Sequence, residues 1–117
     1  MSPIIMRDID NLIFGDIALA ELPYTDGSKT KIRPVLILTR DKNDYLLMKI
    51  TSITDKKEQL DIEVSGDYEN NLEAISVIKV KKISTYSKEI LLQKLWVLWD
   101  KECGIVRKNL KEFVDNL

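Results

Sequence analysis

An arginine and a threonine on two neighbouring segments are the residues of this chain best suited to shared chemistry. Arg33 stands directly before Pro34 and an apolar run, and Thr51 with Ser52 ends a later apolar run. The chain contains no histidine, so the usual proton carrier near neutral pH is absent. Any catalysis must then use arginine, lysine, carboxylates or hydroxyls, a set that suits phosphate chemistry better than most hydrolytic schemes.

Short apolar segments must position these two residues. Residues 17–22 lie between Gly15-Asp16 and Pro23, which favours a strand over a helix too short to be stable. Pro34 fits the first position of a second strand, because proline has no N–H for a ladder. The polar residues 41–44 predict a turn, so residues 34–38 and 45–51 should form a hairpin.

The loop before Arg33 and the strand before Ser52 carry the polar groups of the candidate site. Residues 23–32 have turn chemistry, in which Gly27 takes a positive φ at little steric cost. In the strand at 45–51, the period of two places Leu46, Met48 and Ile50 toward the core. Lys49 and Thr51 should therefore emerge together on the opposite face.

The rest of the chain predicts two more strands and two terminal helices. Residues 59–64 alternate as a half-buried strand, with Asp61 and its odd-numbered neighbours outward. A polar loop over residues 65–71 and a strand at 75–83 follow. Ser87 is a good N-cap for a helix over 88–99, and Asp100 for a second helix to the end of the chain. The fold class is mainly β with C-terminal helices, a small antiparallel sheet or partly closed barrel of about five strands.

Composition sets the class of protein. The 117 residues, 44% hydrophobic and 32% charged, predict one globular domain over 1–117, with residues 1–14 as an extension of uncertain structure. The net charge of −1 gives no strong field for nucleic acid, so such binding must use a local patch. Cys103 lacks a partner and is expected to be a small buried hydrophobe. No apolar run is long enough to cross a bilayer, so we expect a cytoplasmic protein. We expect no cofactor, and Cys103 has no histidine or second cysteine with which to complete a metal site.

Taken in order, short motifs of this chain resemble those of the MazF/PemK family of toxin–antitoxin endoribonucleases, and the loop is most similar to that of the PemK-like branch. The family pattern is a Gly-Asp-Ile strand, a polar loop, an Arg-Pro strand, a strand ending in a hydroxyl pair, then Ser-Val-Ile and Thr. The matching residues here are Gly15-Asp16-Ile17, Arg33-Pro34, Ile50-Thr51-Ser52, Ser76-Val77-Ile78 and Thr85.

The resemblance implies an SH3-like barrel of the MazF/PemK (CcdB-like) type, usually a homodimer. It also implies an mRNA interferase that cuts single-stranded RNA at short sequences without a metal and that an antitoxin inhibits. The catalytic arginine and threonine of the family fall on Arg33 and Thr51. The residues expected to contact RNA are Lys29, Thr30, Lys31, Lys49, Ser52, Lys82 and Thr85. Lys82 stands where related chains often carry an amide, so the family's base preference is not carried over.

Other interpretations of the same residues stay open at this stage. Arg33 can be a solvated arginine or form a structural ion pair with Asp16 or Asp26, and Thr51 can be an ordinary β-former. The lysines can be solvated surface or edge-strand charges. Trp96, Leu98 and Trp99 are expected in the core between the two helices, with a dimer contact as the second possibility. The alternative function is a non-catalytic binding module: a protein-binding toxin or an inactive toxin that binds an antitoxin.

Overall fold

The structure is a computed structural model that describes residues 9–24, 27–52, 57–65 and 75–117. Asp26 of the expected turn and residues 66–71 of the expected polar loop lie outside the described residues. Within the described part of the chain, no helix is both long and apolar enough to cross a membrane.

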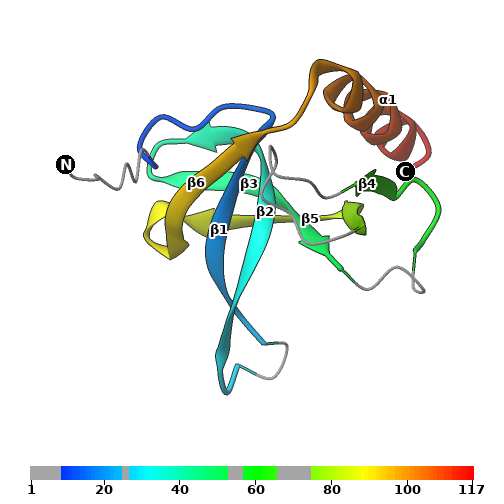
Figure 1. Ribbon diagram of the computed structural model, residues 1–117. Helices are drawn as coiled ribbons and strands as arrows, with labels where there is room; N and C mark the ends of the chain where they lie inside the picture. The colour runs from blue at the N-terminus through cyan, green and yellow to red at the C-terminus, as the bar shows by residue number, and fades with distance from the viewer. Residues whose placement is uncertain (1–8, 25–26, 53–56, 66–74) are drawn as a thin grey trace.

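A single curled antiparallel sheet forms most of the molecule (Figure 1). Its strands are β1 (Asp16–Pro23), β2 (Thr30–Asp41), β3 (Asp44–Thr51), β4 (Ile62–Ser65), β5 (Ile75–Ser87) and β6 (Leu91–Val97). Their order across the sheet is β4-β5-β3-β2-β1-β6, so β4 and β6 are the edges. One helix, α1 (Asp100–Asp115), lies over the end of the sheet that carries β4.

The expected hairpin of the second and third strands is confirmed, but the second strand is longer than predicted. Thr30 and Lys31 already pair with Pro23 and Leu22 of β1, so the loop expected over residues 23–32 is confined to the residues between Pro23 and Thr30. Pro34 consequently lies inside β2 and not at its start. The ladder between β1 and β2 satisfies backbone groups that a loop would leave to water, which explains the extension.

The helix predicted over residues 88–99 is wrong beyond its first turn. Ser87 does accept a hydrogen bond from the Glu89 backbone N–H, but the turn that it caps is a 3-10 helix of three residues. The chain then continues as β6, which pairs with β1. The N-cap of α1 is Trp99 and not Asp100, which lies in the first turn, where a carboxylate favours the positive end of the helix dipole.

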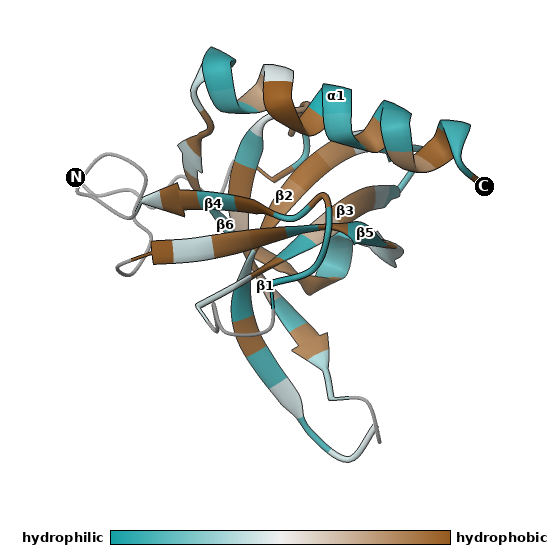
Figure 2. Ribbon diagram, turned by 90° about the vertical axis from the view of Figure 1, so that its right-hand side faces the viewer, coloured by the Kyte–Doolittle hydropathy of each residue, from teal (hydrophilic) through white to brown (hydrophobic). Residues whose placement is uncertain are grey.

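Two hydrophobic cores lie on opposite faces of the central strands. The helix-side core packs against α1 through Cys103 and Val106. The second core, on the other face, includes Val35, Tyr45 and Leu47, all without exposed area. The expectation that the face of Lys49 points away from the core is therefore wrong, since that face has a core of its own. Figure 2 shows hydrophobic and hydrophilic residues alternating in bands along the β1–β2 hairpin.

The residues before and within β4 depart from the predicted pattern. The strand comprises only four residues, with Ile62 and Val64 buried as expected. Asp61 is not outward but 6% exposed, because its Oδ2 atom accepts hydrogen bonds from Lys79 Nζ at 2.6 Å and from the Glu58 N–H at 2.9 Å. Two such donors offset the cost of burying a carboxylate.

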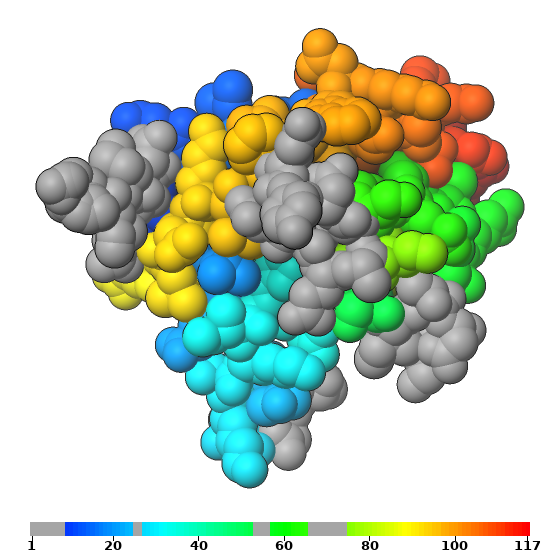
Figure 3. Space-filling view, in the orientation of Figure 1, coloured from blue at the N-terminus to red at the C-terminus, as the bar shows by residue number. Residues whose placement is uncertain are grey.

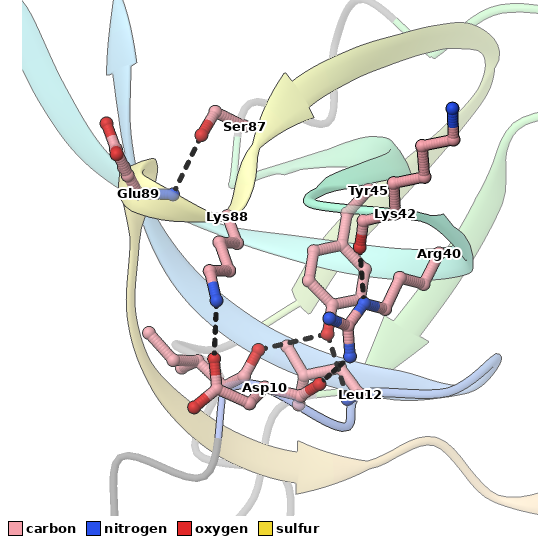
Figure 4. Close-up of polar contacts among 9 residues, drawn as sticks. Asp10, Leu12, Arg40, Lys42, Tyr45, Ser87, Lys88 and Glu89 are labelled. Carbon is pink, nitrogen blue, oxygen red and sulfur yellow. Dashed lines mark hydrogen bonds and ion pairs between the residues drawn. The ribbon is translucent and has the colours of Figure 1, made fainter.

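The described part of the N-terminal extension is fastened to the body of the protein (Figure 4). The Tyr45 hydroxyl donates to the Ile9 carbonyl at 3.0 Å and accepts from the Leu12 N–H at 3.2 Å. The Asp10 carbonyl accepts from Arg40, and its carboxylate lies 3.1 Å from Lys88 Nζ. Leu12 is buried in the second core, so residues 9–12 form part of the fold.

The predicted burial is confirmed for Cys103 and wrong for the two tryptophans. Cys103 is buried, as predicted, and burial raises the pKa of its thiol. Its Sγ approaches Gly15, where a Cβ would lie 3.0 Å from the sulfur and where φ is +98°, so only glycine fits there. Trp96 and Trp99 are 39% and 55% exposed, which contradicts their expected place in the core; Leu98 is buried.

Candidate functional site

Arg33 and Thr51 lie on the same face of two adjacent strands. The ladder between β2 and β3 ends at the pair Val35 and Lys49, and Arg33 and Thr51 stand two positions beyond that pair on their strands. Directly opposed residues of an antiparallel pair share a face, and so do residues two apart along a strand. The side chains of Arg33, Lys49 and Thr51 therefore project to the face of the second core, where the β1–β2 hairpin leaves the sheet.

A small pocket of about 160 Å³ opens at this place. Three of its lining residues are the cations Lys31, Arg33 and Lys49, and the others are Leu22, Pro23 and Tyr24. Arg33 and Lys49 are half-buried, whereas Lys31 is exposed. Three positive charges around one opening form the local basic patch that the nearly neutral chain requires for binding an anion.

The cations of the pocket have no acidic partner within the described part of the chain. The salt bridges there involve other lysines. Asp16, one of the proposed structural partners of Arg33, instead accepts from the Ile13 N–H at 2.8 Å and lies 3.5 Å from Lys94 Nζ. Asp26, the other proposed partner, lies outside the described residues. Among the described residues, no carboxylate pairs with Arg33.

Thr51 lies at the end of β3, beside β5. It pairs with Val77 of β5, which is fully buried, and Thr51 itself is half-buried. Ser52 follows directly and is exposed. Since Thr51 is the last residue of β3, its hydroxyl lies at the same end of the strand as the pocket cations.

The hairpin and β5 supply the other residues expected at the site, but not all on one face. Lys29 and Thr30 are exposed near the tip; Thr30 pairs with Pro23 and, by alternation along β2, faces away from Lys31. Figure 3 shows this hairpin projecting at the lower end of the molecule.

Lys82 and Thr85 lie at different distances from the pocket along β5. Between the pairs Met48–Ile83 and Ile50–Ile78, residues 79–82 face Lys49 alone, which is a bulge. The exposed Lys82 lies in this bulge. Thr85 pairs with Leu46, far along β3 from Thr51 and on the other face, so the structure does not bring it to the pocket.

Tyr24 is a pocket residue that the sequence analysis missed. It is 44% exposed, and its backbone closes the turn by accepting from the Gly27 N–H and donating to the Lys29 carbonyl, both at 2.8 Å. An aromatic residue beside Pro23 in a basic loop was the available signal. Among the described residues, no group of three or more His, Cys, Asp and Glu side chains is arranged to hold a metal ion.

The comparison with known protein families decides the identity of the chain. Residues 14–114 match the model for the PemK-like, MazF-like toxin of type II toxin–antitoxin systems. The chain belongs to this family. The match includes Arg33, Thr51 and every pocket residue, but not residues 9–13, which fasten the N-terminal segment. No curated protein sequence matches the chain.

Solved structures of the PemK/MazF family have the same fold. The Mycobacterium tuberculosis toxin MazF-mt6 has a TM-score of 0.68 at 24% identity, over 86% of this chain and 96% of that one. An endoribonuclease in complex with its cognate antitoxin, from a mycobacterial species, has a TM-score of 0.70 at 15% identity, over 90% and 96%. MazE-MazF from Deinococcus radiodurans has a TM-score of 0.61 at 17% identity, over 88% and 94%. The expected MazF-type barrel is confirmed, as a curled sheet with a single C-terminal helix.

Proposed function

We propose that this PemK/MazF family member is a metal-independent endoribonuclease that cleaves single-stranded RNA at selected sequences, as the toxin of a toxin–antitoxin system. The observation that supports the proposal best is the shared face of Arg33 and Thr51, together with the two further cations of the pocket. Thr51 is not one of the residues that line the pocket, but it lies on the same face and at the same end of β3, and a module that only binds protein does not require an arginine and a hydroxyl on one face.

RNA carries its own nucleophile, which reduces what the protein must supply. The 2′-hydroxyl oxygen bonds to the adjacent phosphorus and loses its proton, the bond from phosphorus to the 5′ oxygen breaks, and that oxygen takes up a proton. The products are a 2′,3′-cyclic phosphate and a 5′-hydroxyl end. Negative charge accumulates on the phosphoryl oxygens in the transition state, so cations fixed around the phosphate accelerate the reaction.

Arg33 is the group that we assign to this charge. Its planar guanidinium offers a rigid fork of donors that matches two phosphoryl oxygens, which the point charge of a lysine does not. Lys31 and Lys49, which also line the pocket, are assigned to the phosphates on either side of the cleaved bond. Thr51 is no base by itself, and we assign to it a hydrogen bond that orients the phosphate or the attacking hydroxyl.

The remaining contacts proposed for RNA come from residues outside the lining of the pocket. Lys29 and Thr30 at the hairpin, Ser52 beyond β3 and Lys82 in the bulge are all exposed. Single-stranded RNA is recognised through splayed bases and 2′-hydroxyls, and these side chains offer hydrogen bonds for both. Thr85 lies on β5 on the other face of the sheet, so it keeps a proposed role only for an RNA that reaches that face.

The proposed partners are a second copy of the chain and an antitoxin, in the cytoplasm. Three large apolar side chains at the edge strand β6 and the start of α1 are exposed: Trp96 39%, Val97 45% and Trp99 55%. Exposed aromatic residues next to one another are typical of interfaces, which supports a homodimer through this edge. The mycobacterial endoribonuclease is in complex with its cognate antitoxin, and the Deinococcus structure contains MazE with MazF. These complexes support an antitoxin for this chain.

The decisive experiment incubates the purified protein with a long single-stranded RNA in EDTA and maps the cut ends. We expect cuts at a short recurrent sequence, with 5′-hydroxyl and cyclic phosphate ends, and no cut where the 2′-hydroxyl before the bond is replaced by hydrogen. Intact RNA with or without Mg²⁺ would favour the non-catalytic binding module, and cutting only with Mg²⁺ would contradict metal independence.

A further inference from the structure

The aromatic residue in the lining of the pocket has no role in the chemistry described above. Tyr24 is 44% exposed, although its backbone is fixed by two hydrogen bonds that close the hairpin turn. A single exposed aromatic side chain is common on protein surfaces. Tyr24 differs because it lines the same pocket as three cations, which makes its ring a candidate for contact with a ligand.

The position of Tyr24 relative to the cations follows from the strand alternation. Ala20 pairs with Arg33 and Leu22 with Lys31, so these four residues share one face. Tyr24 is the next even-numbered residue after Leu22 and continues on this face, in agreement with its place in the lining of the pocket. Along the hairpin, Tyr24 stands beyond Lys31 and farther from the sheet than Arg33.

The size of the pocket limits what it can hold. Its volume of about 160 Å³ is below the roughly 300–1,000 Å³ of sites that enclose a drug-sized ligand. It has room for part of a nucleotide, while the rest of a strand passes over the surface. Its lining combines cations, which suit a phosphate, with the tyrosine, whose ring suits a base.

We propose that Tyr24 stacks on the base of a single-stranded RNA next to the phosphate held by Arg33, and so contributes to the choice of the cleavage site. The ligand class rests on the proposed function. Flat bases stack on tyrosine rings in single-stranded complexes, and each base has such a face. Tyr24 thus fixes the path of the strand and favours bases that stack well, while hydrogen bonds from neighbouring residues add any finer selection.

The test measures binding of a short mixed-sequence 2′-O-methyl oligoribonucleotide, which cannot be cut, by fluorescence anisotropy. We expect Tyr24→Ala to weaken binding by about 10-fold, within the range for removal of one stacked aromatic, and Tyr24→Phe to bind as the wild type does. The matched control is Ile32→Ala, which removes a 55% exposed apolar side chain from the same hairpin but on the other face. This control should leave the affinity unchanged.

Nuclear magnetic resonance distinguishes stacking from a structural role, because only stacking changes the chemical shifts of the Tyr24 ring protons when a base is added. The ring protons that disappear in Tyr24→Phe identify Tyr24, and they should shift upfield with uridine or adenosine 5′-monophosphate but not with ribose 5-phosphate. Equal affinity of Tyr24→Ala and the wild type for the oligonucleotide, or equal shifts with and without a base, would overturn the inference, as would a wild type that does not bind the oligonucleotide. If the protein binds the oligonucleotide through Tyr24 but does not cut RNA, the proposed nuclease activity is contradicted and the stacking role of Tyr24 is supported.

Discussion

Tyr45 and Leu12 are joined by a hydrogen bond of 3.2 Å inside the second core, although 33 positions separate them in the sequence. The same hydroxyl donates to the Ile9 carbonyl. The Tyr45 hydroxyl therefore holds residues 9–12 against the face of the sheet that also carries Arg33.

Tyr45→Phe should destabilise the protein without changing its fold. The Leu12 N–H would remain buried without its acceptor, which costs about 1–3 kcal/mol. Urea unfolding followed by circular dichroism measures the difference. Tyr24→Phe removes the hydroxyl of an exposed tyrosine and should leave the free energy of unfolding within about 0.5 kcal/mol of the wild type; an equal loss in both variants would contradict the bridging role.

Residues 88–97 show where the sequence pattern is insufficient. Ser87 caps a turn as predicted, but the apolar residues after it are compatible with a helix and with a buried strand, and short apolar runs do not separate the two. The free edge of β1 decides the matter, because pairing β6 with β1 satisfies both backbones. That edge is a property of the assembled sheet and not of the segment.

The candidate site was predictable only where it depends on local alternation along one strand. The alternation of two along β3 gave the common face of Lys49 and Thr51, and it holds in the structure. The alternation could not reveal a second core on that face, because Tyr45 and Leu47 share this core with Leu12, which is far away in the sequence. The role of Tyr24 at the pocket depends on how β1 and β2 pair, which local patterns do not specify.

Lys79→Met should destabilise the protein by about 3 kcal/mol at neutral pH, because it leaves the fully buried carboxylate of Asp61 without its cation. Burial lowers the pKa of Lys79, but hydrogen bonds and charges from Asp61 and Glu58 outweigh it and raise the pKa above the ordinary 10.5. The stabilisation is thus complete below 10.5 and is lost as the pH rises through the raised pKa.

Urea unfolding at neutral pH and at several pH values above 10.5 tests whether the stabilisation by Lys79 is lost as the pH rises. The stability difference between the wild type and Lys79→Met should shrink only in the alkaline range. Lys101→Met, a change of an exposed lysine on α1, should show a small difference at every pH. A difference for Lys79→Met that does not vary with pH would refute the linkage.

Thr51→Val removes a hydroxyl and keeps the branched shape that β3 requires. If the hydroxyl orients the reacting groups, kcat should fall by about 10- to 100-fold, because small misplacements of reacting atoms carry costs of that order. KM should change little, since the cations supply most of the binding. Thr51→Ser should recover most of the rate; a Thr51→Val enzyme with unchanged kcat would remove Thr51 from the mechanism.

The most direct measurement compares the rates at which the wild type and Arg33→Ala cut the same single-stranded RNA in EDTA, with circular dichroism to show that both are folded. The account predicts a loss of about 100- to 1,000-fold, as for other removed donors to a developing oxyanion. Arg107→Ala, on α1 away from the pocket, should cut like the wild type. Equal cutting by the folded Arg33→Ala variant and the wild type would contradict the account.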